Sequence, residues 1–553
     1  MKSRAEALKD IQSGSFDVCV IGGGATGSGC ALDSQLRGLR TVLVDASDFA
    51  SATSSASTKM VHGGVRYLEE AFRHLDPAEY KVVKRALHER IHMLKNAPFL
   101  TRAREFITPC YSSFDLAYYE TGLKLYDWIA GSASLAPSHF VSREETLHRL
   151  PKLNPQGLIG AVAYTDGQFD DARYNIALVE SFAAAGGVPL NYAHVTALEK
   201  RADGKLAAVS VQDRLSDQTF VIRARAYVNA AGPFADSIRS MANPSLKPRM
   251  RLSKGVHILL PLEVLSTTDA MLIPKTDDGR VLFAIPWLGR LLVGTTEQEV
   301  GADDELSLTR QELEYLLRHL NRYVASPVKA SQVVGGFAGA RPLLSASDSR
   351  DTKKLARDHE VEVDSQTSLV SIMGGKWTTY RAMAQDTIDA LEKTIGGNPK
   401  ECATLNHKLV GSDGYSADYW KTLVTGFGVA EPSARHLAEK YGTRAAQVLA
   451  LIANDADFGE PLVKGLAPLR AEVAFAARFE MAVAMEDVLA RRIGLQFYGW
   501  TEAIAVAQPA AGILGRELGW SEADRDRALS SYVDKIRGFQ QEAGLTVAPQ
   551  AGA

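Results

Sequence analysis

Three glycines near the amino end of the chain have the spacing of a dinucleotide-binding turn. Gly22, Gly24 and Gly27 form the pattern Gly-x-Gly-x-x-Gly directly after the apolar run 16–21. In such a turn the first glycine permits a tight bend, the second lets backbone amides approach a pyrophosphate, and the third lets a helix pack closely on the strand. Asp45 follows a second apolar run, where its carboxylate can accept hydrogen bonds from a ribose hydroxyl. The spacing therefore predicts a dinucleotide site.

Three further groups of residues indicate a long cofactor with two ends. Residues 51–64 are rich in small hydroxyl side chains and glycine, which let a loop lie against a planar polar group, and a strand that ends before Gly232 would approach the adenosine half. Gly374 and Gly375 precede Lys376 and a helix, whose N-terminal end would stabilise a reduced flavin. Because these segments lie far apart in the chain, they favour FAD over NAD. The predicted cofactor-binding residues are Gly22, Gly24, Gly27, Asp45, Thr53, Ser54, Ser55, Ser57, Lys59, His62, Gly63, Gly64, Gly232, Gly374, Gly375, Lys376 and Thr378.

The elements that must position these residues follow from the apolar pattern. Strand 16–21, helix 25–37 and strand 41–44 make one βαβ unit. Further strands are predicted at 207–212, 219–230, 256–260, 281–285, 290–294 and 369–373, and further helices at 77–96 and 174–185. The pattern predicts an α/β protein with two sheets.

A cluster of helix-breaking residues at 396–399 divides the chain, and helical spacing continues beyond it to about residue 542. We expect an oxidoreductase domain over 1–395 and a C-terminal all-α domain over 396–553. Within the first domain, FAD-binding segments are expected at about 14–75, 160–245 and 346–395, and substrate-domain segments at about 76–159 and 246–345.

Composition limits the classes of function. The 553 residues suggest more than one domain, and a net charge of −3 argues against a nucleic-acid partner. Four scattered cysteines, with no paired spacing, indicate reduced thiols rather than disulfides or a metal site. We expect a reducing, cytoplasmic compartment, no secretory signal and no membrane-spanning helix.

The chain resembles the family of FAD-dependent glycerol-3-phosphate dehydrogenases over about residues 14–540. Eight segments carry the resemblance: 51–69 (SATSSASTKMVHGGVRYLE), 164–173 (YTDGQFDDAR), 228–234 (VNAAGPF), 253–257 (SKGVH), 294–296 (GTT), 339–342 (GARP), 374–381 (GGKWTTYR) and 486–493 (EDVLARRI). The resemblance implies an FAD-binding Rossmann-like (GR2/DAO-type) domain, a mixed-sheet substrate domain and a terminal helical domain. Asp45 stands where many members have glutamate. No EF-hand pattern is present, and this absence favours a bacterial-type enzyme.

The reaction that the resemblance implies is oxidation of sn-glycerol 3-phosphate to dihydroxyacetone phosphate, with hydride transfer from C2 to the flavin. Arg66 and Arg341 are the expected phosphate clamp, because a guanidinium forms bidentate bonds to phosphate oxygens. Tyr67 is expected to add a hydrogen bond, and Arg357 is a further substrate-binding candidate. His257 is the expected base, because the ordinary pKa of imidazole lies near neutral. The predicted catalytic residues are thus His257, Arg341 and Arg66.

Two roles stay open within this family. Lys376 is expected near either the flavin or the substrate. Asp170, Asp171 and Arg173 are expected to hold structure or cofactor rather than to perform chemistry.

Respiratory relatives pass electrons to a quinone and oxidase relatives pass them to oxygen; the oxidase insertion is not recognised here, so quinone is favoured. A basic helix at 77–96, with Lys81, Lys84, Arg85, Arg90 and Lys95, and an aromatic segment at 116–130 suggest a surface that rests on anionic lipid. We expect a peripheral protein on the cytoplasmic face of the inner membrane and a homodimer.

Three alternatives remain. The chain could be a glycerol-3-phosphate oxidase that uses oxygen, or an amino-acid or amine oxidase of the same superfamily, whose arginine binds a carboxylate. It could also be a flavin-binding redox sensor without turnover. The joint presence of Arg66, His257 and Arg341 favours the dehydrogenase.

Overall fold

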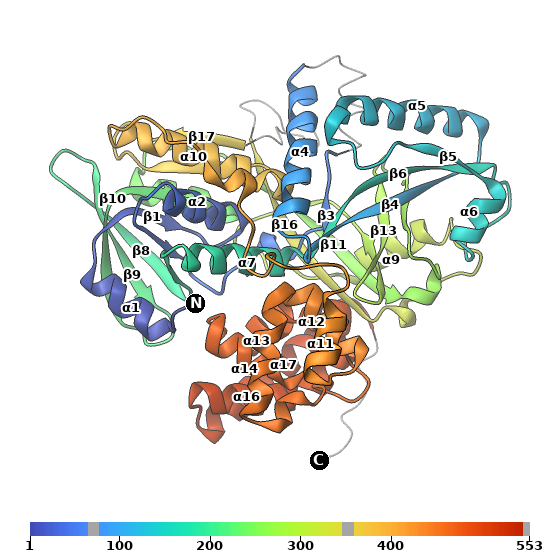
Figure 1. Ribbon diagram of the computed structural model, residues 1–553. Helices are drawn as coiled ribbons and strands as arrows, with labels where there is room; N and C mark the ends of the chain where they lie inside the picture. The colour runs from blue at the N-terminus through green and yellow to red at the C-terminus, as the bar shows by residue number, and fades with distance from the viewer. Residues whose placement is uncertain (65–76, 346–358, 546–553) are drawn as a thin grey trace.

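Two β-sheets form the framework of the protein in the computed structural model, which describes residues 1–64, 77–345 and 359–545 (Figure 1). The first sheet has eight strands, and its central strands are parallel and buried on both faces. Along the sheet these are β17 (His359–Val363), β18 (Val370–Gly374), β10 (Thr219–Asn229), β1 (Phe16–Ile21), β2 (Thr41–Val44) and β7 (Val188–Leu190), with β8 (Ala193–Lys200) and β9 (Leu206–Asp213) continuing from β10.

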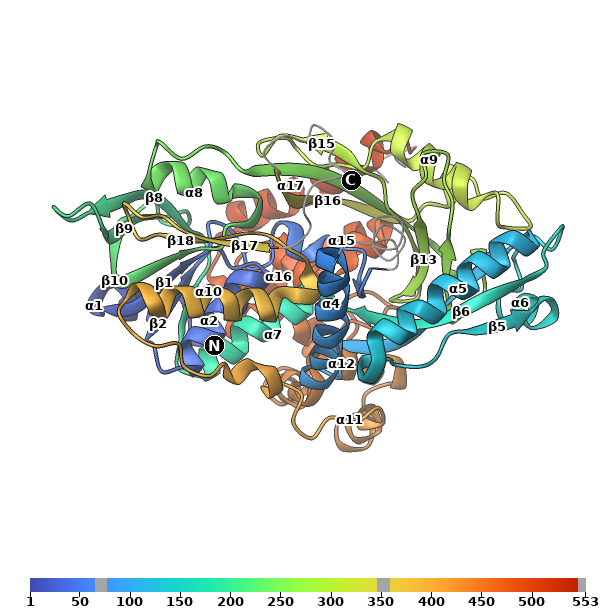
Figure 2. The same cartoon turned by 90° about the horizontal axis from the view of Figure 1, so that it is seen from above.

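Three helices pack together beside this sheet. The helix α2 (Ala25–Leu36) lies between α7 (Asp171–Ala184) and α10 (Tyr380–Thr394), and Figure 2 shows the three side by side. Thus the predicted unit β1–α2–β2 is confirmed. Two short helices, α1 (Arg4–Ser13) and α8 (Ala235–Ala242), complete this half of the molecule.

The second sheet has ten strands and contains the predicted substrate-domain strands. In order these are β15 (Gln298–Val300), β11 (Met250–Pro261), β14 (Arg290–Gly294), β13 (Leu282–Trp287), β12 (Ala270–Ile273), β4 (Thr101–Cys110), β6 (Gly160–Phe169) and β3 (Met60–Val61). In addition, β16 (Gly335–Leu344) pairs with β11, and β5 (His139–Ser142) pairs with β6. Both β3 and β6, which lie in segments expected to bind FAD, therefore pair within the second sheet.

Helices α4 (Pro77–Asn96) and α5 (Ser113–Ala130) cover one face of the second sheet, where Leu87 and Tyr126 pack with Phe106 and Tyr164. Figures 1 and 2 both place α4 between the first-sheet helices and α5. The helices α6 (Arg143–Arg149) and α9 (Arg310–Leu320) also belong to the half of the molecule that contains the second sheet. No helix in the described ranges is long and apolar enough to cross a bilayer.

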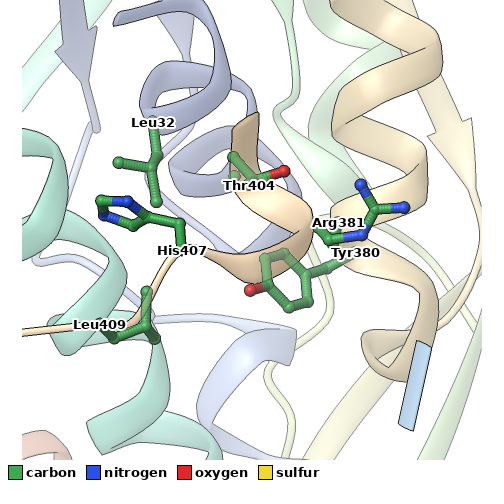
Figure 3. A pocket seen from close by; sticks show the side chains of 7 residues that line it. Leu32, Tyr380, Arg381, Thr404, His407 and Leu409 are labelled. Atoms are coloured by element: carbon green, nitrogen blue, oxygen red, sulfur yellow. The ribbon is translucent and has the colours of Figure 1, made fainter. Parts of the chain in front are cut away.

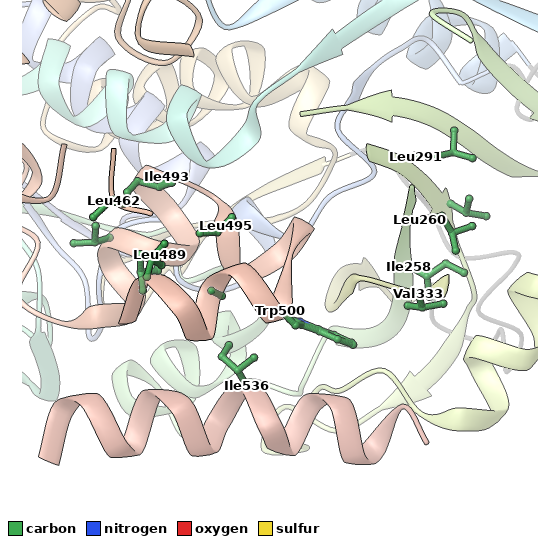
Figure 4. Packing of buried hydrophobic residues seen from close by; sticks show 14 of the residues in the cluster. Ile258, Leu260, Leu291, Val333, Leu462, Leu489, Ile493, Leu495, Trp500 and Ile536 are labelled. Carbon is green, nitrogen blue, oxygen red and sulfur yellow. The ribbon is translucent and has the colours of Figure 1, made fainter. Parts of the chain in front are cut away.

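The C-terminal region is helical, as predicted, and it shares its apolar core with the second sheet. Figure 4 shows Ile258, Leu260 and Leu291 of the sheet in the same buried cluster as Leu489 and Trp500. The helices are α11 (Tyr419–Phe427), α12 (Glu431–Tyr441), α13 (Ala445–Ala450), α14 (Arg470–Phe479), the π-helix η12 (Asp487–Arg492), α15 (Leu495–Tyr498), α16 (Trp500–Leu518) and α17 (Glu522–Glu542).

Candidate functional site

The glycine turn between β1 and α2 has the shape that a pyrophosphate requires. Gly22 has φ +110°, which favours glycine, and a Cβ on Gly27 would overlap the carbonyl oxygen of Gly22. The N-cap of α2 is Gly24, which has no side chain to cap the first amides of the helix. Instead, the amide of Ala25 donates to Ser54 Oγ at 2.9 Å. A helix that begins in this way suits an anionic ligand.

Asp45 lies at the end of β2, beside this turn. Its carboxylate accepts hydrogen bonds from the amides of Gly23 (2.6 Å) and Ser47 (2.8 Å). Burial raises the pKa of Asp45 to about 6, although both amide hydrogen bonds act in the opposite direction. The carboxylate thus occupies the position from which ribose is recognised in this type of turn.

The loop of residues 51–64 connects the parts of the predicted cofactor site. Thr53 Oγ1 donates to the carbonyl of Ala340 in β16 (2.6 Å). The carbonyl of Ser54 accepts from the indole of Trp377 (3.0 Å), and the amide of His62 donates to Thr378 Oγ1 (3.2 Å). Trp377 and Thr378 form the 3-10 turn η7 (Trp377–Thr379) that follows β18. Three segments distant in sequence therefore meet at this loop.

Within the loop, the side chain of Lys59 makes its contacts with other residues of the protein. Its ammonium group donates to Asp171 (2.6 Å) and to the carbonyl of Ser55 (2.7 Å), and three aromatic rings surround it. Asp171 also accepts from the amide and hydroxyl of Ser57. Lys59 therefore orders the loop through its side chain, and its predicted cofactor contact would have to be made by its backbone.

The neighbours of Asp171 also hold structure, as expected. Asp170 accepts from Lys440 at 2.6 Å, and Arg173 donates to both carboxylate oxygens of Glu480 at 2.9 Å. Both contacts connect α7 to the C-terminal helices.

Arg341 lies on a surface formed by β11 and β16. The two strands are antiparallel, with Arg341 opposite Ser253 and Gly339 opposite Gly255. The guanidinium donates to Thr295 Oγ1 (2.9 Å) and to the carbonyl of Thr296 (3.3 Å). A Cβ on Gly255 would collide with this guanidinium, so the absence of a side chain there makes room for it.

His257 lies on the same surface, because residues two apart along a strand face the same way. Only 2% of the residue is exposed, its ring stacks on Phe337 at 4.8 Å, and Nε2 lies 3.0 Å from Thr58 Oγ1. Burial, followed by the charges of Arg341 and Lys59, lowers the pKa of His257 well below its ordinary value. The near-neutral pKa that motivated its prediction as the base is therefore wrong, and the imidazole is neutral.

A buried polar network behind His62 and Gly63 was missed by sequence reasoning. The amide of Gly63 donates to Tyr126 Oη (2.8 Å), and this hydroxyl donates to Asp166 (2.8 Å). Asp166 also pairs with Arg90 at 2.7 Å. Arg90 is therefore buried and does not belong to the predicted basic surface. The one sign of this network in the sequence was Asp166, because it lies in the segment 164–173 that carries the family resemblance.

The histidines of the site retain unsatisfied atoms. Nδ1 of His62 and Nδ1 of His257 are both buried and make no hydrogen bond within the described ranges. Burial lowers the pKa of His62, and Lys376 and Arg90 lower it further against the opposing effect of Asp166. Buried polar atoms are normally hydrogen-bonded, so these nitrogens indicate that a bound group completes the site.

The remaining predicted residues divide into two sets. Gly374 and Gly375 have φ +71° and +84° at the end of β18, directly before Lys376, and Gly232 has φ +56° with open space beside it. Arg66, Tyr67 and Arg357 lie outside the described residues. Gly64 ends the described part of the loop, with φ +91°.

A small cavity between α2 and α10 is not part of this site. Figure 3 shows Leu32 of α2, Tyr380 and Arg381 of α10, and His407 around it. Its volume of about 10 Å³ is sufficient for a water molecule at most.

Comparison with known proteins identifies the cofactor. A family model described as FAD dependent oxidoreductase matches residues 17–379, and a model described as the C-terminal domain of alpha-glycerophosphate oxidase matches residues 402–525. A solved structure of the glycerol-3-phosphate dehydrogenase from Bacillus halodurans, complexed with FAD, has a TM-score of 0.78 at 28% identity and covers 100% of this chain and 99% of its own. The predicted fold class and the FAD cofactor are thus confirmed.

Two curated relatives are similar over most of the chain. The protein of Mus musculus named mitochondrial glycerol-3-phosphate dehydrogenase is 38% identical over 527 residues, which are 93% of this chain and 72% of the relative. An Arabidopsis thaliana protein with the corresponding name is 38% identical over 545 residues, which are 95% of this chain and 86% of the relative.

Proposed function

The chain belongs to the family of FAD-dependent glycerol-3-phosphate dehydrogenases, and on this premise we propose how its own residues oxidise sn-glycerol 3-phosphate to dihydroxyacetone phosphate. FAD, when bound, supplies the hydride acceptor. The glycine turn, Asp45, the loop of residues 51–64 and the segment from Gly374 to Thr378 would hold it.

Arg341 binds the phosphate group of the substrate. A guanidinium stays charged and can bind two phosphate oxygens at once, which suits a dianion. The contacts of Arg341 with Thr295 and Thr296 fix the direction of its side chain before substrate arrives. Arg66, Tyr67 and Arg357 remain candidates for the rest of the clamp, and Lys376 for a charge near the flavin or the substrate.

His257 accepts the proton of the substrate hydroxyl. Its depressed pKa makes it a weaker base than free imidazole, but it also keeps the ring unprotonated and able to accept. Thr58 and Phe337 fix the plane of the ring, and Nδ1 is the nitrogen without a partner in the described ranges. The observation that carries the proposal is this pairing of an oriented guanidinium with a neutral imidazole on one surface.

Electrons pass on to a membrane quinone, and two helices support contact with a lipid surface. Along the outer side of α5, Phe114 and Trp128 are 77% and 71% exposed, and Tyr118 lies between them. On α4, Lys81, Lys84 and Lys95 are exposed. Figure 1 shows α5 at the edge of the molecule opposite the C-terminal helices. The cytoplasmic face of the inner membrane and a homodimer rest on the family resemblance alone.

Anaerobic reduction of the bound flavin tests the substrate. The purified holoenzyme is mixed with sn-glycerol 3-phosphate, glycerol or sarcosine while the flavin absorbance is followed. We expect rapid bleaching with sn-glycerol 3-phosphate alone. Comparable bleaching with sarcosine would favour an amine oxidase, and no bleaching with any of the three would favour a redox sensor.

The acceptor is tested on the reduced enzyme. Reoxidation by a short-chain quinone is compared with reoxidation by dissolved oxygen at equal concentration. Faster reoxidation by the quinone is expected, whereas faster reoxidation by oxygen would make the chain an oxidase.

A further inference from the structure

The C-terminal helices reach the cofactor half of the molecule through two adjacent arginines. Arg491 Nε donates to Asp48 at 2.7 Å, and Arg492 donates to both oxygens of the same carboxylate at 2.8 and 3.0 Å. The side-chain amide of Asn191 also donates to the carboxylate of Asp48, at 3.2 Å. The side chains of Asp48 and Arg492 are fully buried, and that of Arg491 is nearly so.

Asp48 belongs to the turn that carries Asp45, residues 45–50. The carboxylate of Asp45 accepts from the amide of Ser47, and the amide of Ala50 donates to the carbonyl of Gly23. A Cβ on Gly23 would collide with the ring of Phe49. The turn is therefore packed against the glycines on one side and bound by the arginines on the other.

The charges of the two domains are complementary at this turn. Asp48 is buried and Asp45 is partly buried, and the charge of Asp48 raises the pKa of Asp45. Burial would raise the pKa of Asp48, but the charges of Arg492 and Arg491 hold it below its ordinary value. Arg491 also lowers the pKa of Asp45. The other ionisable groups facing this cluster are Asp487, Glu480 and Glu486, which pair with the same arginines, and Tyr192, whose hydroxyl donates to Asp487.

We propose that the C-terminal helical domain positions the adenosine end of FAD, with Arg492 and Arg491 as positioning residues that fix Asp48 and, through the turn 45–50, the ribose-binding Asp45. The π-helix η12 presents both side chains to one carboxylate, although they are adjacent in sequence. This role goes beyond the oxidation chemistry.

The chain offers a matched control for a purely structural contact. Arg444 of the C-terminal domain pairs with Glu180 of α7, and both side chains are largely buried. Like the Arg492 pair, this pair joins the C-terminal helices to the first domain, but it does not contact the turn 45–50. An effect of domain docking alone should appear equally in both.

The test compares the full-length variants Arg492→Met and Arg444→Met. FAD is removed and rebound, its dissociation constant is measured by flavin fluorescence, and thermal unfolding of the FAD-free protein is recorded. Arg492→Met should raise the dissociation constant about tenfold or more, because it removes one partner of a buried ion pair beside the cofactor turn. Arg444→Met should lower the melting temperature and leave the dissociation constant unchanged.

Equal FAD affinity in Arg492→Met and wild type, or an equal loss in Arg444→Met, would overturn the proposal. If Arg492→Met does not fold, two further variants test the proposal. Arg492→Lys keeps the positive charge, and the double variant Asp48→Asn/Arg492→Met removes the carboxylate that would otherwise be buried without its partner. Both should fold and bind FAD more weakly than wild type, since neither keeps the two-oxygen contact; wild-type affinity in both would also overturn it. An unchanged KM for sn-glycerol 3-phosphate in the FAD-saturated variants is expected, which separates this effect from failure of the proposed reaction.

Discussion

The imidazole of His257 is held neutral by burial and by the positive charges of Arg341 and Lys59, all of which lower its pKa. An unprotonated base is needed for proton acceptance, so activity should persist until the pH falls through the depressed pKa. We predict that kcat/KM, after allowance for titration of the substrate phosphate, shows no acid limb at pH 6.5 and loses activity only well below it.

Replacement of the ring tests the same role. His257→Gln should lower kcat by about 10²–10⁴-fold, the usual contribution of a general base, with FAD still bound. Rapid-reaction measurement of flavin reduction isolates this step. A variant that reduces its flavin at the wild-type rate would remove His257 from the chemistry.

Asp45 gives a second pH dependence at the scale of one residue. Burial raises its pKa to about 6, so the carboxyl is protonated below this pH and ionised above it. An ionised carboxylate is the stronger acceptor for a ribose hydroxyl. We predict that FAD affinity increases as the pH rises from 5 to 7, and that Asp45→Asn binds FAD weakly with little pH dependence. The same slope in both proteins, measured by FAD titration, would contradict this role.

At the scale of elements, α5 has two faces with different tasks. Its inner face places Tyr126 against Gly63 and Asp166, and its outer face exposes Phe114 and Trp128. Burying two such aromatic side chains in lipid contributes about 1.5–3 kcal/mol each. The double variant Phe114→Ser/Trp128→Ser should therefore bind anionic phospholipid vesicles at least about tenfold more weakly, with dye-linked activity unchanged.

A control for this prediction lies on the C-terminal helices. Phe427, the last residue of α11, is also exposed, so Phe427→Ser removes an exposed aromatic ring from the C-terminal helices. Vesicle co-sedimentation should be unaffected in this variant. An equal loss in both variants, or none in the double variant, would exclude α5 as the lipid surface.

Elements with an uninterrupted apolar sequence could be predicted, whereas elements whose apolar pattern is interrupted by charged residues or glycine could not. Both β1 and β2 coincide with the predicted runs because parallel strands buried on both faces need continuous apolar sequence. The strands β4 and β16 were missed, since Arg102, Arg104 and the glycines of β16 interrupt their patterns. Helix α1 was missed because it is charged, although Ser3 and Glu6 form a capping box at its start.

The site could be predicted where it depends on local sequence. The glycine turn and Asp45 needed only a βαβ pattern, but the roles of Tyr126 and Arg90 depend on how α5 and α4 pack against a distant loop. The depressed pKa of His257 likewise depends on burial beside Arg341, which no spacing reveals.

At the scale of the whole molecule, the two sheets and the C-terminal helices act as one assembly. The breaker cluster at 396–399 indicated a separate helical domain, yet the apolar residues of the C-terminal helices continue the core of the second sheet. The core is made by segments distant in sequence and continues across the expected boundary. The boundary at residue 396 therefore remains a prediction. The arrangement places the glycine turn on the first sheet and Arg341 on the second, so the proposed site draws on both sheets.

Anaerobic titration of Arg341→Ala with sn-glycerol 3-phosphate tests most directly whether this surface holds a phosphorylated substrate over the flavin. We predict that the variant keeps its FAD and that the substrate concentration for half-reduction rises about 100-fold or more, because charge-assisted bonds to phosphate are lost. Arg310→Ala, which removes an exposed arginine on α9, should titrate like the wild type. An Arg341→Ala protein whose flavin is reduced at wild-type substrate concentrations would contradict the account.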